Sequence, residues 1–299
     1  MSRLDGRVAI VTGAGRGLGR AHALLMAAQG AAVVVNDLGG DVDGGGAPDA
    51  TPAQQVVAEI EAAGGKAVIS GHDVADWDQA AALVALAVET FGDVHVLVNN
   101  AGILRDRTLA NLGEDEWDAV LRVHLRGHAA MTRHAMAWWR AQAKDGADVR
   151  ASIVNTTSVA GFTGNFGQAA YAAAKLGIVA LSRVAALEGE RYGVRSNAVS
   201  PSARTRLEDS ITPTDADFDP FDPAHVSPLV AWLAERDCPA TAQVFQAYGD
   251  RVNIVAMPTV VHRLANGGTR WTPEALDTAL ARNLLDPPGI ADFVEGLQP

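Results

Sequence analysis

Two side chains in the middle of the chain have the types and spacing needed to move a proton. Tyr171 and Lys175 lie four residues apart in a segment with helical periodicity, so both project from one face of the helix. A tyrosine hydroxyl in water has a pKa of about 10, and a nearby ammonium group stabilises the phenolate. The pair could therefore exchange a proton with an alcohol oxygen near neutral pH. A Tyr and a Lys at this spacing are common in helices, and the interpretation gains weight from Ser158, which follows the predicted strand Ser152–Thr156.

A glycine-rich loop near the N-terminus could bind a dinucleotide. The predicted strand Val8–Thr12 runs into the sequence GAGRGLG and then into a predicted helix, and this context favours a cofactor loop over a plain turn. Gly13 permits the turn, Gly17 leaves room for a pyrophosphate, and Gly19 lets the helix pack close to the sheet. The predicted cofactor contacts in this loop are Gly13, Gly15, Arg16, Gly17, Leu18 and Gly19.

One carboxylate bears on the choice of dinucleotide. Asp37 ends the predicted second strand, where it could accept hydrogen bonds from the adenosine ribose hydroxyls. A 2′-phosphate beside it would meet like-charge repulsion, so NAD is the expected cofactor. Arg16 could pair with such a phosphate or be a solvated loop residue, and NADP is therefore the less favoured alternative.

Short β-branched runs alternate with segments of helical periodicity. The predicted strands are Val8–Thr12, Ala32–Asp37, Ala67–Ser70, Val94–Asn99, Ser152–Thr156 and Val194–Val199. The predicted helices are Leu18–Gln29, Pro52–Ala63, Trp77–Phe91, Glu114–Lys144 (with or without an interruption) and Ala169–Arg191. This alternation predicts an α/β fold with a Rossmann-type, doubly wound parallel sheet of about seven strands.

The 299 residues suit a single domain. We expect residues 1–205 to form the cofactor-binding and catalytic core, and residues 206–299 to form a substrate lid and C-terminal extension. The predicted loops are Gly39–Pro48, Ser202–Pro228 and Asn266–Pro273. Within the second loop, the acidic stretch Leu207–Pro223 is either a mobile lid or a solvated loop.

Charge and composition exclude several classes of partner. A formal net charge of −11 opposes a general attraction to nucleic acid or anionic lipid, so neither is expected as a partner. The apolar runs have strand length, far below the roughly 20 residues that span a bilayer. The N-terminus lacks a secretion signal, and the single Cys238 suits a reducing compartment, so a cytoplasmic location is expected. No metal site is predicted.

Taken together, these motifs resemble the short-chain dehydrogenase/reductase family. Four of them occur in the family's order, namely TGAGRGLG at Thr12–Gly19, NNAG at Asn99–Gly102, Ser158, and YAAAK at Tyr171–Lys175. The resemblance implies hydride transfer between a carbinol carbon and NAD, with Tyr171 as the acid/base. It also implies that Ser158 orients the substrate oxygen, that Lys175 holds the nicotinamide ribose, and that the chain forms a homodimer or homotetramer.

Further cofactor contacts follow from this resemblance alone. Asp73 and Val74 resemble the pair that contacts adenine, and Asn99, Ala101 and Gly102 resemble the turn that lines the adenosine ribose. Tyr171, Lys175, Pro201 and Thr205 are expected near the nicotinamide. Ser202 and Ala203 interrupt the family's usual Pro-Gly, so Pro201 and Thr205 also fit ordinary loop positions.

The chain departs from the broad family at one catalytic position. Many members carry an asparagine where this chain has His124, which we include among the candidate catalytic residues. Two interpretations stay open. The imidazole could order the water that connects Lys175 to solvent, or it could be a core side chain whose hydrogen bonds are satisfied internally.

A closer resemblance indicates a substrate class. The strings VNDLGGD (35–41), NNAGILRDR (99–107), VHLRG (123–127) and GNFGQAAY (164–171) resemble the (3R)-hydroxyacyl-CoA dehydrogenase domain of peroxisomal multifunctional enzyme type 2, also called 17β-hydroxysteroid dehydrogenase type 4. That group shares the histidine. The tail strings QVFQAYG (243–249) and GTRWTP (268–273) resemble actinobacterial enzymes that oxidise hydroxyacyl-CoA thioesters during steroid side-chain breakdown.

This resemblance implies NAD-dependent oxidation of a 3-hydroxyacyl-CoA thioester to the 3-ketoacyl-CoA. Four arginines expected at the carboxyl edge of the sheet could meet CoA phosphates or pair with the acidic stretch, namely Arg105, Arg107, Arg204 and Arg206. The alternatives are a hydroxysteroid dehydrogenase, a 3-oxoacyl thioester reductase, and a nucleotide-binding sensor without turnover.

Overall fold

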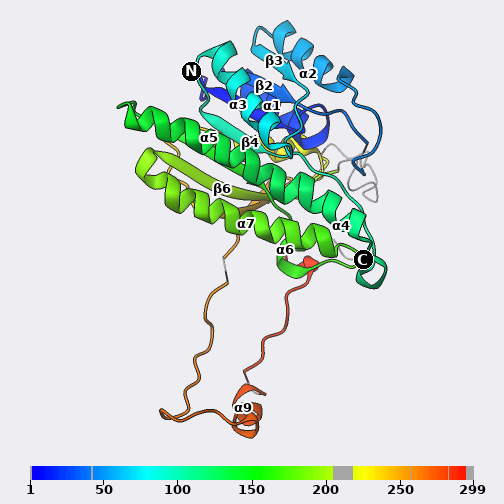
Figure 1. Ribbon diagram of the computed structural model, residues 1–299, viewed down its shortest axis with the longest axis vertical. Coiled ribbons are helices and arrows are strands. Elements are labelled where there is room, and N and C mark those ends of the chain that lie inside the picture. Colours follow the sequence, from blue (N-terminus) through cyan, green and yellow to red (C-terminus); the bar gives the residue numbers. More distant parts are fainter. Residues whose placement is uncertain (1, 42, 205–217, 257, 282, 294–299) are drawn as a thin grey trace.

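Eight strands form one sheet in the order β3-β2-β1-β4-β5-β6-β7-β8 (Figure 1). This computed structural model describes residues 2–41, 43–204, 218–256, 258–281 and 283–293. The strands are β1 (Val8–Thr12), β2 (Ala32–Asn36), β3 (Lys66–Ser70), β4 (Val96–Asn99), β5 (Ala151–Thr156), β6 (Val194–Pro201), β7 (Val244–Tyr248) and β8 (Arg251–Ile254). Neighbours from β3 to β7 run parallel, and β8 pairs antiparallel with β7. The fold is therefore the predicted Rossmann-type sheet in a single domain, with an antiparallel strand added at one edge.

Helices connect the strands and cover both faces of the sheet. The α-helices are α1 (Gly17–Ala28), α2 (Thr51–Ala62), α3 (Trp77–Phe91), α4 (Glu114–Leu121), α5 (Gly127–Lys144), α6 (Ala160–Thr163), α7 (Ala169–Gly189), α8 (Ser227–Leu233) and α9 (Pro273–Leu280). The shorter turns are η1 (Leu109–Asn111), the π-helical turn η2 (Arg122–Arg126), η3 (Glu190–Tyr192), η4 (Pro223–His225) and η5 (Ile290–Asp292).

Alternate residues of the central strands enter two separate cores. On β2, Val33 and Val35 pack with α1, α2 and α8, whereas Val34 packs with α3 and α5 on the opposite face. Successive side chains of a strand point to opposite faces of the sheet. Helices cover both faces here, so these residues of β2 are apolar on both faces and the sequence shows no alternation of polar and apolar residues. The near-continuous apolar runs of the sequence follow from this double burial.

The strand order reverses beside β1, which lies between β2 and β4. In an open parallel sheet, such a reversal creates a crevice at the carboxyl ends of the strands, where ligands bind. The segments that leave β1, β4, β5 and β6 all start from this edge, so the glycine-rich loop, the NNAG turn and Ser158 meet there.

Several elements differ from the sequence prediction. The long predicted helix Glu114–Lys144 is divided into α4 and α5 by the π-helical turn η2. β7, β8, α6, α8 and α9 were not predicted. Each has eight residues or fewer, and β7 and α8 also pack on elements distant in the sequence. The acidic stretch Leu207–Pro223, expected to be a mobile lid or a solvated loop, lies mostly outside the described residues.

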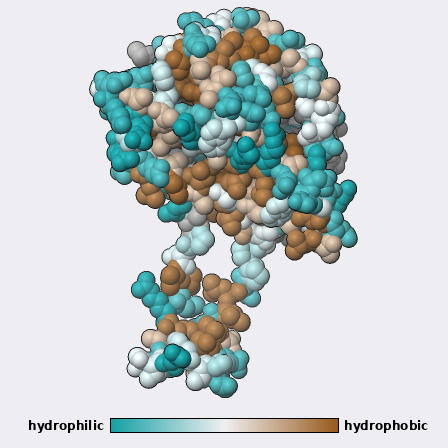
Figure 2. Space-filling model, in the orientation of Figure 1, coloured by the Kyte–Doolittle hydropathy of each residue, from teal (hydrophilic) through white to brown (hydrophobic). Residues whose placement is uncertain are grey.

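The C-terminal extension runs far from the sheet. After β8 the chain leaves the body, forms α9 and returns to the body near its end (Figure 1). Apolar side chains are exposed along this arm (Figure 2), among them Val260, Val261, Leu284 and Leu285. At its end Phe293 stacks on Phe162 of α6 with ring centroids 5.8 Å apart, so the arm contacts the body beside the predicted active site.

One segment among the described residues, Ala169–Tyr192, is long and apolar enough to cross a bilayer by length and composition. It contains α7, whose buried face packs against β5 and β6. Core helices of α/β proteins share this composition.

Candidate active site

The first turns of α7 place Tyr171 and Lys175 against the carboxyl ends of β5 and β6. Lys175 is only 2% exposed, and its Nζ donates a hydrogen bond of 2.8 Å to the carbonyl oxygen of Thr156. The same Nζ lies 5.4 Å from the centroid of the Tyr171 ring. Burial lowers the pKa of Lys175 to about 7, so a negative charge beside this ammonium would stabilise it.

Ser158 lies beside this pair because the end of β5 is held against α7. Thr157, its immediate neighbour, donates from Oγ1 to the carbonyl oxygen of Lys175 at 2.7 Å. A Cβ on Gly161 would come within 2.9 Å of the backbone nitrogen of Leu176, so the glycine allows α6 to approach α7 closely. The Ser158 Oγ accepts the backbone N–H of Ala160 at 3.2 Å and keeps its own proton to donate.

His124 lies in the π-helical turn η2, a distortion often found at functional sites. Its ring is 1% exposed and meets the Tyr171 ring edge-on, with centroids 5.2 Å apart. Nε2 lies 3.1 Å from the backbone nitrogen and 2.8 Å from the carbonyl oxygen of Ile103. A Cβ on Gly102 would come within 2.4 Å of the imidazole, so this glycine leaves space for the ring.

The surroundings of His124 favour the neutral form of its imidazole. Burial, and then the positive charge of Lys175, hold its pKa well below the usual value of 6.5. Nδ1 is buried and has no hydrogen-bond partner among the described residues. The ring therefore fixes the backbone of Ile103 through one nitrogen and leaves the other available.

The glycine-rich loop has the backbone that the sequence predicts. Gly13 and Gly17 have φ of +63° and +52°, in the left-handed region that favours glycine. A Cβ on Gly19 would lie 2.1 Å from the carbonyl oxygen of Gly13, so no larger residue fits there. Arg16 is exposed at the N-cap of α1 and makes no side-chain cap, and the first turn of the helix carries no acidic residue. The terminal N–H groups are therefore suited to a pyrophosphate.

Asp37 turns back onto this loop. Its Oδ2 accepts the N–H of Gly15 and its Oδ1 accepts the N–H of Gly39, both at 2.7 Å. Each carboxylate oxygen can accept a further bond, so ribose hydroxyls could join these donors. A Cβ on Gly15 would lie 2.8 Å from Oδ2, so the close approach of Asp37 depends on this glycine.

Two residues without a predicted role join the cofactor loop to the NNAG turn. The Nδ2 of Asn100 donates to the carbonyl oxygens of Thr12 and Gly13, at 2.9 and 3.2 Å. The Oγ1 of Thr12 accepts the N–H groups of Asn100 and Ala101, at 2.9 and 3.1 Å. Both residues belong to the family motifs, which was the only signal in the sequence for them.

The side chain of Asn99 points into the protein instead of the crevice. It is 1% exposed and donates to the Oδ1 of Asn155 at 2.9 Å and to the Oγ1 of Thr132 at 3.2 Å. Only its backbone can line a ribose. Ala101 and Gly102, which follow it, are half-buried at the crevice.

Asp73 and Val74 follow β3, at the adenine end of the predicted site. Asp73 forms an ion pair of 2.6 Å with Arg122, and its Oδ1 accepts the N–H of Ala75 at 2.9 Å. Val74 is buried and would lie 3.0 Å from a Cβ on Gly127. Both residues thus also have structural roles in joining β3 to the helical layer.

Pro201 is the last residue of β6, which extends two residues beyond the predicted strand, and Thr205 lies outside the described residues. The candidate phosphate-binding arginines have internal partners. Arg105 donates to the carbonyl oxygen of Asp43 at 2.7 Å, Arg107 pairs with Glu116 at 2.8 Å, and Arg204 pairs with Asp219. Arg206 is outside the described residues.

The arrangement combines a possible proton carrier with an anion-binding loop at one sheet edge. Tyr171, Lys175 and Ser158 lie together on α7 and at the end of β5, and the glycine-rich loop follows β1 at the same edge. Such a site can hold a dinucleotide while a hydroxyl group is deprotonated beside it. No cluster of three or more His, Cys, Asp or Glu suited to a metal ion occurs in the described part of the chain.

Comparison with known proteins identifies the family. The family model described as short chain dehydrogenase matches residues 7–215. Hydroxyacyl-CoA dehydrogenase ChsB1 of Mycobacterium tuberculosis is 46% identical over 292 residues, covering 93% of this chain and 88% of that protein. Peroxisomal multifunctional enzyme type 2 of Mus musculus is 44% identical over 244 residues, covering 82% of this chain and 32% of that protein.

A solved structure is also similar, the crystal structure of a short chain dehydrogenase from Mycobacterium avium. Its sequence is 51% identical, its TM-score is 0.84, and the match covers 94% of this chain and 95% of that chain. These similarities confirm the predicted resemblance, and they indicate an oxidoreductase that acts on CH–OH groups with a nicotinamide dinucleotide. A sensor without turnover is therefore not retained as an alternative. The chain belongs to the short-chain dehydrogenase family.

Proposed function

We propose that this enzyme oxidises a 3-hydroxyacyl-CoA thioester to the 3-ketoacyl-CoA with NAD as the hydride acceptor. The observation that carries the proposal is the Tyr171–Lys175 pair on α7, at the same carboxyl edge of the sheet as the glycine-rich loop. The chain is similar over nearly its full length to a hydroxyacyl-CoA dehydrogenase. A steroid side-chain thioester is one candidate within this class.

In this proposal Ser158 donates a hydrogen bond to the substrate hydroxyl oxygen and holds it near Tyr171. The Tyr171 phenolate accepts the hydroxyl proton, and the ammonium of Lys175 compensates its negative charge. Lys175 is well placed for this because burial weakens its own hold on the proton and makes a nearby anion favourable. The bound nicotinamide supplies the acceptor for the hydride that leaves the carbinol carbon. His124 acts as a positioning residue by fixing Ile103 beside Tyr171.

NAD is favoured over NADP by the position of Asp37. Its carboxylate lies against the glycine-rich loop, where a 2′-phosphate would bring two negative charges together. Arg16 is exposed near Asp49, which already offers it an opposite charge. The remaining cofactor contacts proposed are the backbones of Asn99, Ala101 and Gly102, together with Asp73, Val74, Pro201 and Thr205.

If the candidate phosphate-binding arginines bind the phosphates of CoA, they must first release their present contacts within the chain. Arg105, Arg107 and Arg204 each contact a group of the chain itself, so CoA phosphates would have to replace those contacts. The contacts of Arg105 and Arg107 lie at the surface, so replacing them costs little stability, whereas the Arg204–Asp219 pair is partly buried and costs more to replace. We further propose that residues 206–299 contribute to the substrate side of the site and that the enzyme is a cytoplasmic homodimer or homotetramer.

The experiment is NADH formation from a panel of 3-hydroxyacyl-CoA thioesters of increasing size, with NADP as the control cofactor. Turnover with NAD and thioesters supports the proposal. Turnover of free steroid alcohols alone would favour a hydroxysteroid dehydrogenase, and efficient NADPH-dependent reduction of 3-oxoacyl thioesters would favour a biosynthetic reductase. Either of these results would overturn the substrate assignment while leaving the family intact.

The proton carrier is tested separately by Tyr171→Phe. Removing the hydroxyl should lower kcat by at least about 10³-fold, because general acid–base catalysis contributes up to about 10⁴-fold. NAD binding, measured by fluorescence quenching, should stay within about twofold, since the glycine-rich loop is untouched. A variant with a near-normal kcat would exclude Tyr171 as the acid/base.

A further inference from the structure

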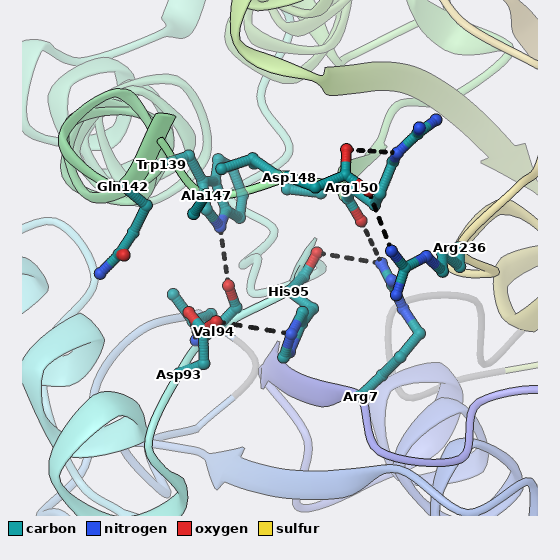
Figure 3. A pocket seen from close by; sticks show the side chains of 12 residues that line it. Arg7, Asp93, Val94, His95, Trp139, Gln142, Ala147, Asp148, Arg150 and Arg236 are labelled. Atoms are coloured by element: carbon teal, nitrogen blue, oxygen red, sulfur yellow. Dashed lines mark hydrogen bonds and ion pairs between the residues drawn. The ribbon is translucent and has the colours of Figure 1, made fainter. Parts of the chain in front are cut away.

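A small cavity of about 90 Å³ lies at the amino ends of the strands, opposite the carboxyl ends that carry the active site. Its walls come from the segments that enter β1, β4 and β5 and from the end of α5 (Figure 3). The charged and aromatic side chains of its lining are Arg7, Asp93, His95, Trp139, Asp148, Arg150 and Arg236. None of them belongs to the dehydrogenase site described above.

Arg7 is a buried cation without a carboxylate partner. The residue is 5% exposed, and its Nη2 donates to the carbonyl oxygens of Arg150 at 3.0 Å and His95 at 3.3 Å. Nε is buried and has no hydrogen-bond partner in the described part of the chain. No carboxylate of the described residues lies within ion-pair distance of this guanidinium. A buried charge with an unused donor is unfavourable unless a ligand or water completes it.

Positive charge exceeds negative charge at this cavity. Three guanidinium groups line it, from Arg7, Arg150 and Arg236, against the carboxylates of Asp93 and Asp148. Asp148 is shared between Arg150 and Arg236, at 3.0 Å from each. Burial, and then repulsion by Arg195 and Arg236, lower the pKa of Arg7 to about 10, and the more distant carboxylates of Asp237 and Asp93 offset only part of this.

Asp93 forms no ion pair with Arg7, because other groups contact both of its oxygens. Its Oδ1 accepts the Nε1–H of Trp138 at 2.8 Å, and its Oδ2 lies 3.5 Å from Nε2 of His95. Figure 3 shows Asp93 on the His95 side of the cavity, whereas the head of Arg7 lies toward Arg236. The carboxylate on the cationic side of the cavity, Asp148, is thus shared by Arg150 and Arg236, and the Arg7 guanidinium has no carboxylate within ion-pair distance among the residues that the structure describes.

We propose that this cavity binds a small oxyanion of the size of phosphate, held by Arg7 and Arg236. Guanidinium groups match phosphate oxygens in geometry and charge, and a phosphate here would pair the buried cation. The wall formed by Trp139, whose indole is fixed by a 2.7 Å bond to the Val94 carbonyl, limits the ligand to a compact group. Free inorganic phosphate and the end of a phosphate monoester share this chemistry.

The test is calorimetric titration of the full chain with inorganic phosphate, against chloride at matched ionic strength. We expect saturable binding with a dissociation constant below about 1 mM. Two exposed rim residues should change it in opposite directions. Asp148→Asn removes a competing negative charge and should tighten binding about fivefold, whereas Arg236→Gln should weaken it about fivefold. Arg20→Gln, which breaks an exposed ion pair with Glu59 far from the cavity, should leave binding unchanged.

These variants also separate the cavity from the glycine-rich loop, which attracts phosphate on its own. Binding that is equal in Asp148→Asn, Arg236→Gln and the parent protein would place the anion elsewhere and overturn the proposal, as would the absence of saturable binding. A parallel titration with glycerol phosphate distinguishes the source. Affinity for both ligands indicates a site open to monoesters, and affinity for inorganic phosphate alone indicates a closed site for the free ion.

Discussion

A buried cation lies at the carboxyl ends of the strands, the carboxyl edge, and another lies at their amino ends, the amino edge. The two cations have different contacts. At the carboxyl edge, Lys175 lies beside Tyr171 and gives one hydrogen bond to Thr156. At the amino edge, Arg7 joins the segments that enter β4 and β5 through two carbonyl oxygens. Burial lowers the pKa of both, to about 7 for Lys175 and about 10 for Arg7.

The difference lies in what each cation can do near neutral pH. A lysine with a pKa of about 7 can gain or lose its proton during a reaction, so burial makes it responsive to a neighbouring phenolate. An arginine with a pKa of about 10 stays charged near neutral pH, so it can bind acceptors and anions but does not exchange its proton. The carboxyl edge is thus suited to proton chemistry, and the amino edge is suited to structure and anion binding.

The largest effect that would sharpen this comparison is expected for Lys175→Met. Loss of the ammonium should lower kcat by about 10³-fold, because the Tyr171 phenolate would lack its counter-charge. The same variant should be more stable than the parent protein by about 4 kcal/mol at pH 7, because a buried charge is removed.

The pH dependence gives the sign of this stability change. The unfolded chain holds the Lys175 proton up to pH 10.5 and the native state holds it only up to about 7, so the parent protein gains stability as the pH rises between these values. The advantage of Lys175→Met should therefore be fully present below pH 7 and disappear above pH 10.5. Urea unfolding at pH 6, 8 and 10 measures it. A destabilised Lys175→Met variant would show that the Thr156 contact outweighs desolvation.

At the opposite edge, Arg7→Met should destabilise the protein by about 2 kcal/mol. Removing Arg7 takes the side-chain donor from the carbonyl oxygen of Arg150 and leaves the carbonyl oxygen of His95 with the N–H of Ser152 alone. This loss exceeds the gain from removing a buried charge that the two carbonyls already solvate. Urea unfolding at pH 7 checks the sign, with Arg20→Gln as an exposed control near zero. If Arg7→Met were stabilising, the two buried cations would be equivalent, and the contrast between the edges would fail.

The sequence predicts the active edge better than the amino edge, for physical reasons. Gly13, Gly19 and Asp37 are predictable because a turn, a close approach and a strand end each impose a local demand on residue type. The orientation of Asn99 depends on Asn155 and Thr132, which are distant in the sequence, and no local pattern indicates that its side chain is buried. Arg7 likewise looks like a surface residue before a strand until the segments before β4 and β5 close over it.

The helical interruption shows the same limit. The prediction allowed a break within Glu114–Lys144 and did not place it, because the break is defined by tertiary contacts. In the structure it lies at η2, where His124 contacts Ile103 beyond β4. Two interpretations of His124 were open, a core side chain with internal hydrogen bonds and an imidazole that orders water. The contact of Nε2 with Ile103 supports the first, and Nδ1, which has no partner among the described residues, could still bind water.

The smallest expected effect concerns this third buried basic group. The unfolded chain protonates His124 below pH 6.5, whereas the native state resists protonation to a much lower pH, so the parent protein loses stability as the pH falls below 6.5. His124→Asn can keep a hydrogen bond to Ile103 without this proton linkage. Between pH 7 and pH 5 it should lose about 1–2 kcal/mol less stability than the parent protein.

His22→Asn is the matched control. His22 is also buried and its pKa is lowered to about 3, but it contacts Ser227 away from Tyr171. Both variants should reduce the acid sensitivity, and only His124→Asn should change kcat. Equal kcat values in the two variants would place His124 with the structural imidazoles and confine the proton chemistry of the carboxyl edge to Tyr171 and Lys175.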